Sequence, residues 1–268
     1  MKDFLGKTIF ITGAANGIGK HLSELFYHRN ASIVMADIYT EGMVEYTAKW
    51  NKDRYLIIQM DVSDSKRWEN AMTMAIKKYG CIHYGINAAG IIEPGYIDAV
   101  GFDSIDRTID VNLKGTMYGS KIFAQQFLIQ KHGHIINFGS LASLAAVPGL
   151  NTYSASKFGV RGFTLAIAQE LEDKGIFVSL ICPDAVNTPM LEYQKDKEAA
   201  ALTFSGSRPL TVVEVGKSIL YIIEKKEREL WLPTFRGITA VTSTFAPSLA
   251  KMLRKILMAK GLKNQKLW

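Results

Sequence analysis

Short apolar runs alternate with longer amphipathic segments along most of the chain. The short runs are rich in Ile, Val and Phe, whereas in the longer segments apolar residues recur every three or four positions. Such alternation is typical of βαβ units, in which parallel strands form one sheet and the connecting helices cover both of its faces. The pattern therefore predicts an α/β fold with a doubly wound parallel sheet.

The predicted strands comprise residues 7–12, 32–36, 55–60, 83–87, 134–138, 177–182 and 229–232. The predicted helices comprise residues 17–29, 41–50, 64–79, 102–130, 152–172 and 212–225. Residues 183–209 show no clear periodicity, and long loops in compact domains often act as lids. At 268 residues the chain fits one large domain, predicted as residues 1–245, followed by a basic segment of residues 246–268.

The C-terminal segment combines positive charge with a helical apolar stripe. It carries six Lys or Arg and no Asp or Glu, and so holds six of the seven net positive charges. The stripe comprises Leu249, Met252, Leu253, Ile256 and Leu257, with Lys251, Arg254 and Lys255 between them. Two interpretations of this amphipathic helix stay open, namely a peripheral membrane contact that feeds a lipophilic substrate, and packing on its own or a neighbouring subunit. Charge confined to a tail argues against nucleic acid as a partner.

Several functional classes are not supported by the composition. The first residues contain no long apolar run, and no stretch approaches about 18 apolar residues, so neither a signal peptide nor a membrane span is expected. Cys81 and Cys182 are too few for a disulfide framework, which favours a cytoplasmic protein. The five histidines form no ligand-spaced pair with a carboxylate, and we expect no metal.

A glycine-rich turn joins the first predicted strand to the first predicted helix. Glycines in this context permit a tight turn and let the backbone approach a pyrophosphate, which the helix N-terminus then stabilises. The residues predicted to bind a dinucleotide here are Thr12, Gly13, Asn16, Gly17, Ile18 and Gly19.

Asp37 closes the second strand, 18 residues after Gly19. A carboxylate at this position can accept hydrogen bonds from a ribose hydroxyl and repels a 2′-phosphate. Neither Asn16 nor Ile38 carries a positive charge that would bind that phosphate. The expected cofactor is therefore NAD rather than NADP, although Lys20 could still reach a phosphate.

Tyr153 and Lys157 are four residues apart, which puts both side chains on one face of a helix. An ammonium group beside a phenol favours phenolate, so we expect Lys157 to lower the pKa of Tyr153. Such a phenol could serve as a catalytic acid or base. Ser140 lies 13 residues before Tyr153, just after a predicted strand.

Together these motifs resemble the short-chain dehydrogenase/reductase family, over about residues 5 to 235. Residues 12–19 match its TGxxxGxG turn, and Tyr153 and Lys157 match its YxxxK motif. Asn112 and Ser140 match the other two residues of its catalytic tetrad. Further matches are Asp61 and Val62 at the adenine contact, Asn87, Ala88, Ala89 and Gly90 at NNAG, and Pro183, Val186 and Thr188 at PGxVxT. The sequence departs from the family at Ala88, at Gly139 and at Asp184, which replaces a glycine.

The resemblance implies a Rossmann-type fold, a homodimer or homotetramer, and a role for each matched residue. Tyr153 would exchange a proton with the substrate oxygen while hydride moves to or from the nicotinamide. Lys157 would hold the nicotinamide ribose, and Ser140 would orient the substrate oxygen. Asn112 would support a water relay behind the lysine, and Thr188 would bind the carboxamide.

Apolar residues of the expected lid and of the segment after Ser140 favour a hydrophobic substrate. These are Met190, Leu191, Tyr193, Leu202 and Phe204, with Leu141, Leu144, Ala145, Val147 and Leu150. We therefore expect an NAD-dependent oxidoreductase that acts on a hydrophobic secondary alcohol or ketone, such as a lipid, steroid or retinoid. The alternatives are an NADPH-dependent ketone or 3-oxoacyl reductase and a cofactor-sensing binding protein on the same fold.

Overall fold

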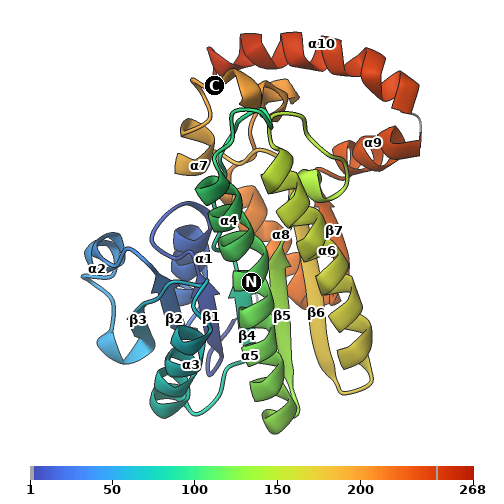
Figure 1. Cartoon of the computed structure of the whole chain (residues 1–268). Helices are drawn as coiled ribbons and strands as arrows, with labels where there is room; N and C mark the ends of the chain where they lie inside the picture. Colours follow the sequence, from blue (N-terminus) through green and yellow to red (C-terminus); the bar gives the residue numbers. More distant parts are fainter. Residues whose placement is uncertain (1–2, 246) are drawn as a thin grey trace.

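The computed structural model describes residues 3–245 and 247–268, without the side chains of residues 247–250 and 253. Among these residues, seven parallel strands form one sheet in the order β3-β2-β1-β4-β5-β6-β7 (Figure 1). The strands are β1 (Thr8–Thr12), β2 (Ser32–Asp37), β3 (Tyr55–Gln59), β4 (Tyr84–Asn87), β5 (Gly133–Phe138), β6 (Ile176–Pro183) and β7 (Glu229–Leu232). The strand order reverses between β1 and β4, and this reversal is where doubly wound sheets place their ligands.

Helices cover both faces of the sheet. The α-helices are α1 (Gly17–Tyr27), α2 (Glu41–Tyr46), α3 (Ser65–Tyr79), α4 (Phe102–Ile109), α5 (Gly115–Gln130), α6 (Asn151–Glu172), α7 (Pro189–Glu192), α8 (Val212–Lys225), α9 (Thr234–Phe245) and α10 (Pro247–Gln265). Short 3₁₀ segments are η1 (Lys52–Arg54), η3 (Leu141–Ser143) and η4 (Glu198–Ser205), and η2 (Asp110–Lys114) is π-helical. The prediction of a doubly wound Rossmann-type sheet is confirmed.

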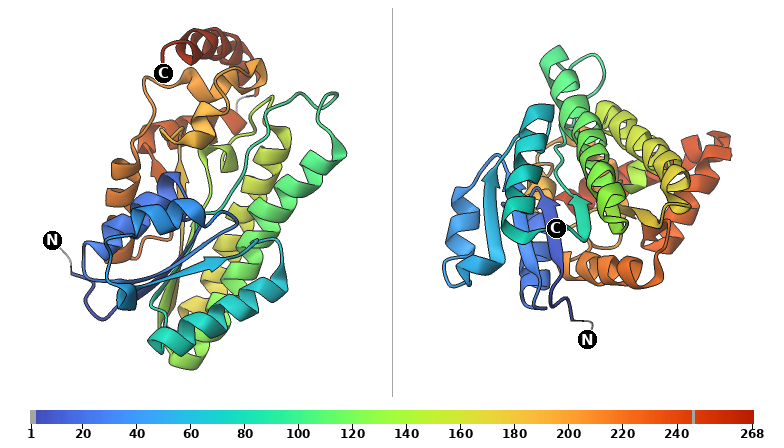
Figure 2. Two further views of the ribbon diagram at one scale, coloured as in Figure 1. Left: turned by 90° about the vertical axis from the view of Figure 1, so that its left-hand side faces the viewer. Right: turned by 90° about the horizontal axis from the view of Figure 1, so that it is seen from below.

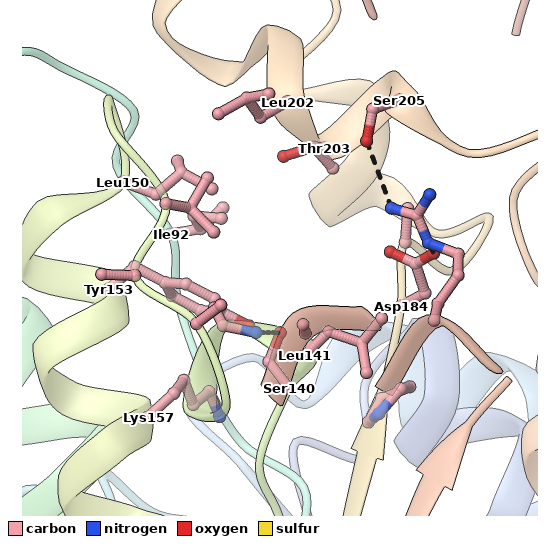
Figure 3. Close-up of a pocket in the computed structure, with 18 of the residues that line it drawn as sticks. Ile92, Ser140, Leu141, Leu150, Tyr153, Lys157, Asp184, Leu202, Thr203 and Ser205 are labelled. Carbon is pink, nitrogen blue, oxygen red and sulfur yellow. Dashed lines mark hydrogen bonds and ion pairs between the residues drawn. The ribbon is translucent and has the colours of Figure 1, made fainter. Parts of the chain in front are cut away.

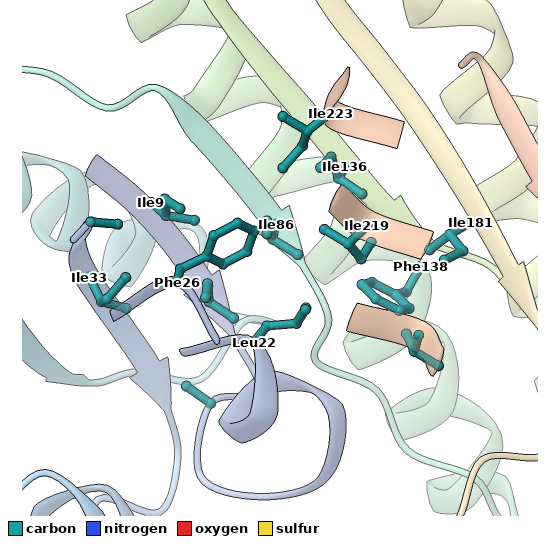
Figure 4. Close-up of a cluster of buried hydrophobic side chains, with 14 of the residues drawn as sticks. Ile9, Leu22, Phe26, Ile33, Ile86, Ile136, Phe138, Ile181, Ile219 and Ile223 are labelled. Carbon is teal, nitrogen blue, oxygen red and sulfur yellow. The ribbon is translucent and has the colours of Figure 1, made fainter. Parts of the chain in front are cut away.

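Alternate residues of the central strand β1 supply two separate cores. Ile9 and Ile11 join Phe26 of α1 and Ile219 of α8 on one face (Figure 4). The intervening Phe10 points to the opposite face, among side chains of α3, α5 and α6. Successive strand residues point to opposite faces, so a sheet buried on both sides needs continuous apolar strands. This explains why all five residues of β1 are buried.

The predicted strands lie within one or two residues of the observed ones, but some helices differ. Residues 102–130 are helical throughout, as predicted, but the π-helical turn η2 lies between α4 and α5. A single π turn keeps the chain helical, so a prediction of helix over these residues does not reveal it. The helix predicted at residues 41–50 ends at Tyr46, and residues 183–209 form α7 and η4 rather than a plain loop.

Helix α9 has no counterpart among the predicted elements. Its sequence is rich in Thr, whose branched Cβ lowers helix propensity, so tertiary packing must supply much of its stability. Gly237 allows this packing, because a Cβ at that position would lie 2.5 Å from Cβ of Trp231 on β7. Helix α9 thereby extends the fold beyond the last strand.

Helix α10 lies across the end of the molecule that carries α7 and η4 (Figures 1 and 2). Its C-terminal half packs on η4, where a Cβ at Gly261 would overlap the carbonyl oxygen of Ala201. The structure thus shows packing on the same chain, one of the two interpretations of the tail. The side chains of Leu249 and Leu253 and the proposed boundary at residue 246 lie outside the described residues. No helix of the described part is long and apolar enough to cross a membrane.

Candidate active site

The glycine-rich turn leaves bare backbone at the switch point of the sheet. Gly13 has a φ of 68°, in the left-handed region, and a Cβ there would lie 2.8 Å from Cα of Ala89. A Cβ at Gly19 would overlap the carbonyl oxygen of Gly13. The Thr12 hydroxyl accepts hydrogen bonds from the backbone N–H groups of Ala88 and Ala89, at 3.1 and 3.2 Å. The turn therefore fits the close backbone approach that a pyrophosphate requires.

The Asp37 carboxylate is fixed at the end of β2 by backbone groups. It accepts hydrogen bonds from the N–H of Ala15 at 3.0 Å and from the N–H of Tyr39 at 3.1 Å. Within the described residues, no cation forms an ion pair with it. Asn16 is exposed and caps α1 without a side-chain hydrogen bond. This arrangement leaves a negative charge beside the turn.

The end of β3 lies next to Asp37, as an adenine-contacting pair would require. The N–H of Met60 donates to the carbonyl oxygen of Asp37 at 2.8 Å. Asp61 is exposed and accepts from the backbone and hydroxyl of Ser63, at 2.9 and 2.7 Å. Val62 is buried against Gly115, where a Cβ would lie 2.8 Å from its side chain.

Tyr153 and Lys157 lie on α6 and line one large cavity with Ser140 (Figure 3). The cavity has a volume of about 990 Å³. Nζ of Lys157 donates to the carbonyl oxygen of Phe138 at 2.8 Å and lies 5.7 Å from the centre of the Tyr153 ring. The two side chains thus share one face of the helix, as their spacing predicts.

Burial dominates the protonation of both groups. It raises the pKa of Tyr153 to about 12, against an opposing hydrogen bond with Ser140. Burial also lowers the pKa of Lys157 to about 8. The expectation of a lowered pKa for Tyr153 is therefore wrong for the chain alone, because desolvation raises it.

Ser140 follows β5 by two residues and begins η3. Its hydroxyl accepts from the N–H of Ala142 at 3.1 Å, and its own N–H donates to the Ser143 hydroxyl at 3.0 Å. These reciprocal bonds form a capping box that fixes the serine in the cavity wall. The preceding residue is Gly139, where a Cβ would lie 2.8 Å from Sγ of Cys182.

Asn112 lies in the π-helical turn η2 and is completely buried. Its side chain accepts from the N–H of Ile91 at 2.8 Å and donates to the carbonyl oxygen of the same residue at 2.9 Å. It also donates to the Ser156 hydroxyl at 3.1 Å. Asn112 thus joins η2, α6 and the segment after β4. A Cβ added at Gly90 would lie within 4 Å of both Asn112 and Lys157, so both side chains lie next to Gly90.

The remaining cofactor candidates surround the same cavity. Ile18, Ala88, Gly90, Pro183, Val186 and Thr188 all contribute to its wall. A Cβ at Gly17 would lie 3.2 Å from the Thr188 side chain, which places the glycine turn beside the segment after β6. The structure therefore brings the two ends of the candidate dinucleotide site together.

Most of the expected apolar lining faces the cavity. Met190, Leu191, Leu202, Leu141, Ala145, Val147 and Leu150 line it. Figure 3 shows Leu202 and Thr203 across the cavity from Ser140 and Tyr153. Three residues of the expected lining do not belong to it. Leu144 is buried, Phe204 is buried against Trp268, and Tyr193 instead donates to the Glu93 carboxylate at 2.6 Å.

A comparison with known families agrees with this geometry. The sequence profile described as short chain dehydrogenase matches residues 7–199. The chain belongs to the short-chain dehydrogenase family. It is therefore an oxidoreductase that uses a nicotinamide cofactor.

Relatives of this short-chain dehydrogenase act on different substrates. Diacetyl reductase, (S)-acetoin forming, of Staphylococcus epidermidis is 35% identical over 189 residues, covering 69% of this chain and 74% of that protein. The 3-oxoacyl-acyl-carrier-protein reductase of Thermotoga maritima is 31% identical over 224 residues, covering 81% and 90%. The 3-alpha-(or 20-beta)-hydroxysteroid dehydrogenase of Mycobacterium bovis is 30% identical over 218 residues, covering 81% and 82%.

Solved structures show the same architecture. A 4-hydroxyisoleucine dehydrogenase complexed with NADH superimposes with a TM-score of 0.75 at 26% identity, covering 84% of this chain and 96% of that one. Levodione reductase superimposes with a TM-score of 0.78 at 21% identity, covering 85% and 96%, a likeness of fold alone.

Two features of this short-chain dehydrogenase were missed by sequence reasoning. Asn87 donates to Asn137 at 2.8 Å, and Asn137 donates to Thr164 at 3.0 Å, so a buried hydrogen-bond network joins β4, β5 and α6. An asparagine within the apolar run of residues 134–138 was its only signal in the sequence. The second feature is Arg236 of α9, whose Nε lies 2.5 Å from the Asp184 carboxylate although the N–H is not directed at it. Asp184, which replaces the family glycine, thereby ties the segment after β6 to α9.

Proposed function

We propose that this short-chain dehydrogenase interconverts a hydrophobic secondary alcohol and its ketone with NAD as cofactor. The observation that carries the proposal is the presence of Ser140, Tyr153 and Lys157 in one wall of a large, mainly apolar cavity. Apolar cavities with a few convergent polar groups bind and orient small organic molecules. A lipid-, steroid- or retinoid-like substrate fits this lining.

The proposed mechanism assigns a separate task to each residue. When bound, the nicotinamide supplies or accepts the hydride. Tyr153 is protonated at neutral pH because its pKa is about 12, so its hydroxyl can donate a proton to a carbonyl oxygen. In the opposite direction the phenol must first lose this proton, and oxidation is expected to accelerate as the pH rises. Ser140 donates a hydrogen bond that orients the same substrate oxygen.

Lys157 and Asn112 position the reacting groups. Lys157 is held by the Phe138 carbonyl oxygen beside the tyrosine, where its ammonium can bind the ribose hydroxyls of the cofactor. Asn112 anchors η2 to Ile91 and Ser156, and so keeps the wall behind Lys157 in place. Thr188 would hold the carboxamide, and it lies beside Gly17 of the glycine turn.

The preference for NAD rests on the fixed carboxylate of Asp37. A 2′-phosphate beside it would meet like-charge repulsion of about 1–3 kcal/mol at close range. Calorimetric titration with both cofactors should give tighter binding of NAD, and Asp37→Ala should reduce the difference. Asp173→Ala, at the C-cap of α6, removes the same charge outside the cavity and should leave the difference unchanged. Tighter binding of NADP by the wild-type protein would refute the preference.

An NADPH-dependent 3-oxoacyl reductase is the second candidate within the same chemistry. The 31% identity to the Thermotoga maritima reductase favours it. Lipophilic secondary alcohols and ketones, assayed beside 3-oxoacyl thioesters with each cofactor, distinguish the two functions. If only 3-oxoacyl thioesters are turned over, and only with NADPH, the 3-oxoacyl reductase function replaces the one proposed above.

We further propose a homodimer or homotetramer and a peripheral contact of residues 247–268 with membranes. Self-association is supported by membership of the short-chain dehydrogenase family, whose members are generally oligomeric. The C-terminal segment supports the membrane contact, because Met252 and Leu267 are exposed there among lysines.

A further inference from the structure

One side of the C-terminal half of α10 packs on the protein. At its C-terminal end, Gln265 is buried and donates to the carbonyl oxygens of Gln194 and Lys197, at 3.3 and 2.9 Å. Asn264 donates to the carbonyl oxygen of Phe204 at 2.8 Å. Gly261 is buried on the same side, against η4. This side of α10 therefore rests on the segment that covers the cavity.

Lys251 and Arg254 continue the same side toward the start of the helix. Residues 251, 254, 258, 261 and 265 are separated by three or four positions, which aligns them along one helical face. Both cations contribute to the wall of the cavity, and their side chains are exposed. Lys251 and Arg254 thus mark the inner side of α10, whereas Lys255 and Lys263, which do not contribute to the cavity wall, mark its outer side.

The two cations have no acidic partner within the described part of the chain. None of its ion pairs includes them, and residues 247–268 contain no Asp or Glu. Arg236 is the third cation of this end of the cavity, but Asp184 balances its charge. The cavity consequently carries uncompensated positive charge on its outer wall.

Different parts of the cavity wall carry different kinds of side chain. The proton-transfer groups Ser140 and Tyr153 lie in one wall, and apolar side chains such as Leu150 and Leu202 follow (Figure 3). The outer wall adds Lys251 and Arg254 together with the hydroxyls of Ser243 and Thr244. A ligand that fills the whole cavity would be polar at its reacting end, apolar in the middle and anionic at the far end.

We propose that Lys251 and Arg254 bind a carboxylate or phosphate at the end of the substrate opposite the reacting carbon. The substrate is then an amphipathic keto or hydroxy compound, with an apolar chain or ring system between its two polar ends. This inference rests on the proposed function, because it takes Ser140 and Tyr153 as the reacting end. Hydrogen bonds to charged groups in a partly closed cavity are stronger than those between neutral groups, which makes such a pair an effective determinant of specificity.

Direct binding tests the proposal independently of turnover. The probes are methyl ketones of increasing chain length that end in a carboxylate, each compared with its uncharged methyl ester. Isothermal calorimetry on the wild-type protein with NAD should show about tenfold tighter binding of the best-fitting acid than of its ester. This preference should shrink as salt is added, because the contact is partly exposed.

Two variants with the same loss of charge separate the inner from the outer side of α10. Lys251→Gln/Arg254→Gln should bind acid and ester equally, with affinity for the ester unchanged. Lys255→Gln/Lys263→Gln should retain the wild-type preference. In assays, the inner variant should raise KM for the acid and leave kcat unaltered.

Three results would overturn the proposal. They are equal binding of acid and ester by the wild-type protein, failure of every acid to bind, and an equal loss of preference in the outer variant. The last result would assign the charge of α10 to a general surface effect such as binding of anionic lipid. Selective binding of acids without any turnover would refute the proposed function while leaving the anion site intact.

Discussion

At the scale of single residues, burial controls the chemistry of the candidate site more than spacing does. The four-residue separation correctly predicts that Tyr153 and Lys157 share a helix face, and they line one cavity. It does not predict their pKa values, because desolvation depends on the surrounding elements. Residues near each other in sequence are thus predictable in position, whereas their electrostatics depend on long-range packing.

The buried ammonium of Lys157 predicts a specific dependence of stability on pH. Its pKa falls from 10.5 to about 8 on folding, so between these values the unfolded chain binds more protons than the folded one. The free energy of unfolding should therefore rise with pH across this window. Across this window the free energy of unfolding of the wild-type protein should rise by about 1–3 kcal/mol more than that of Lys157→Met. Urea unfolding at several pH values measures this difference.

The exposed Lys255 supplies a matched control for this measurement. Lys255→Met removes the same charge without removing a buried group. Its free energy of unfolding, plotted against pH, should therefore run parallel to that of the wild-type protein. If the Lys157→Met curve is also parallel, Lys157 is not desolvated in the folded protein.

At the scale of elements, the sequence predicts the strands and the glycine turn because local patterns determine them. Helix α9 and the turn η2 escape prediction for different reasons. Contact with Trp231 stabilises the Thr-rich α9, and a buried Asn112 lies within η2, neither of which leaves a periodic signal. Arg236 was missed for the same reason, since only the placement of α9 brings it to Asp184.

Two glycines in helices should respond to alanine in opposite directions. Gly19→Ala should destabilise the protein by about 2–4 kcal/mol and weaken cofactor binding, because the new Cβ overlaps the Gly13 carbonyl oxygen. Gly162→Ala should stabilise it by about 0.5–1 kcal/mol, because nothing lies near its Cβ in α6. Chemical unfolding checks both, and a Gly19→Ala protein as stable as wild type would contradict the tight turn.

At the scale of the whole molecule, α7, η4, α9 and α10 all contribute to the cavity wall. These elements lie together at one end of the sheet (Figure 2). The lid segment is also tied to the segment after β4, because Lys197 contacts the Glu93 carboxylate at 2.7 Å. The sequence indicates an apolar lid and an amphipathic tail separately. It cannot show that the tail packs on the lid, because that contact joins residues about 60 positions apart.

The outer side of α10 gives a prediction for the membrane contact. The wild-type protein should co-sediment with vesicles rich in anionic lipid at low salt, with about 1 kcal/mol from each lysine near the surface. Lys255→Gln/Lys263→Gln/Lys266→Gln should abolish this binding, whereas Lys251→Gln/Arg254→Gln should largely retain it. Substitution is preferable to deletion of residues 247–268, which would uncover η4. Absence of vesicle binding at low salt would leave α10 as a packing element alone.

The most direct test of the account is the turnover of Tyr153→Phe beside its cofactor affinity. This substitution removes the proton-transferring hydroxyl and little else, so NAD should bind nearly as tightly as to the wild-type protein. The rate of NADH formation from a lipophilic secondary alcohol identified with the wild-type enzyme should fall by a factor of about 10²–10⁴. Near wild-type turnover in Tyr153→Phe would contradict the assignment of Tyr153 as the acid and base of the reaction.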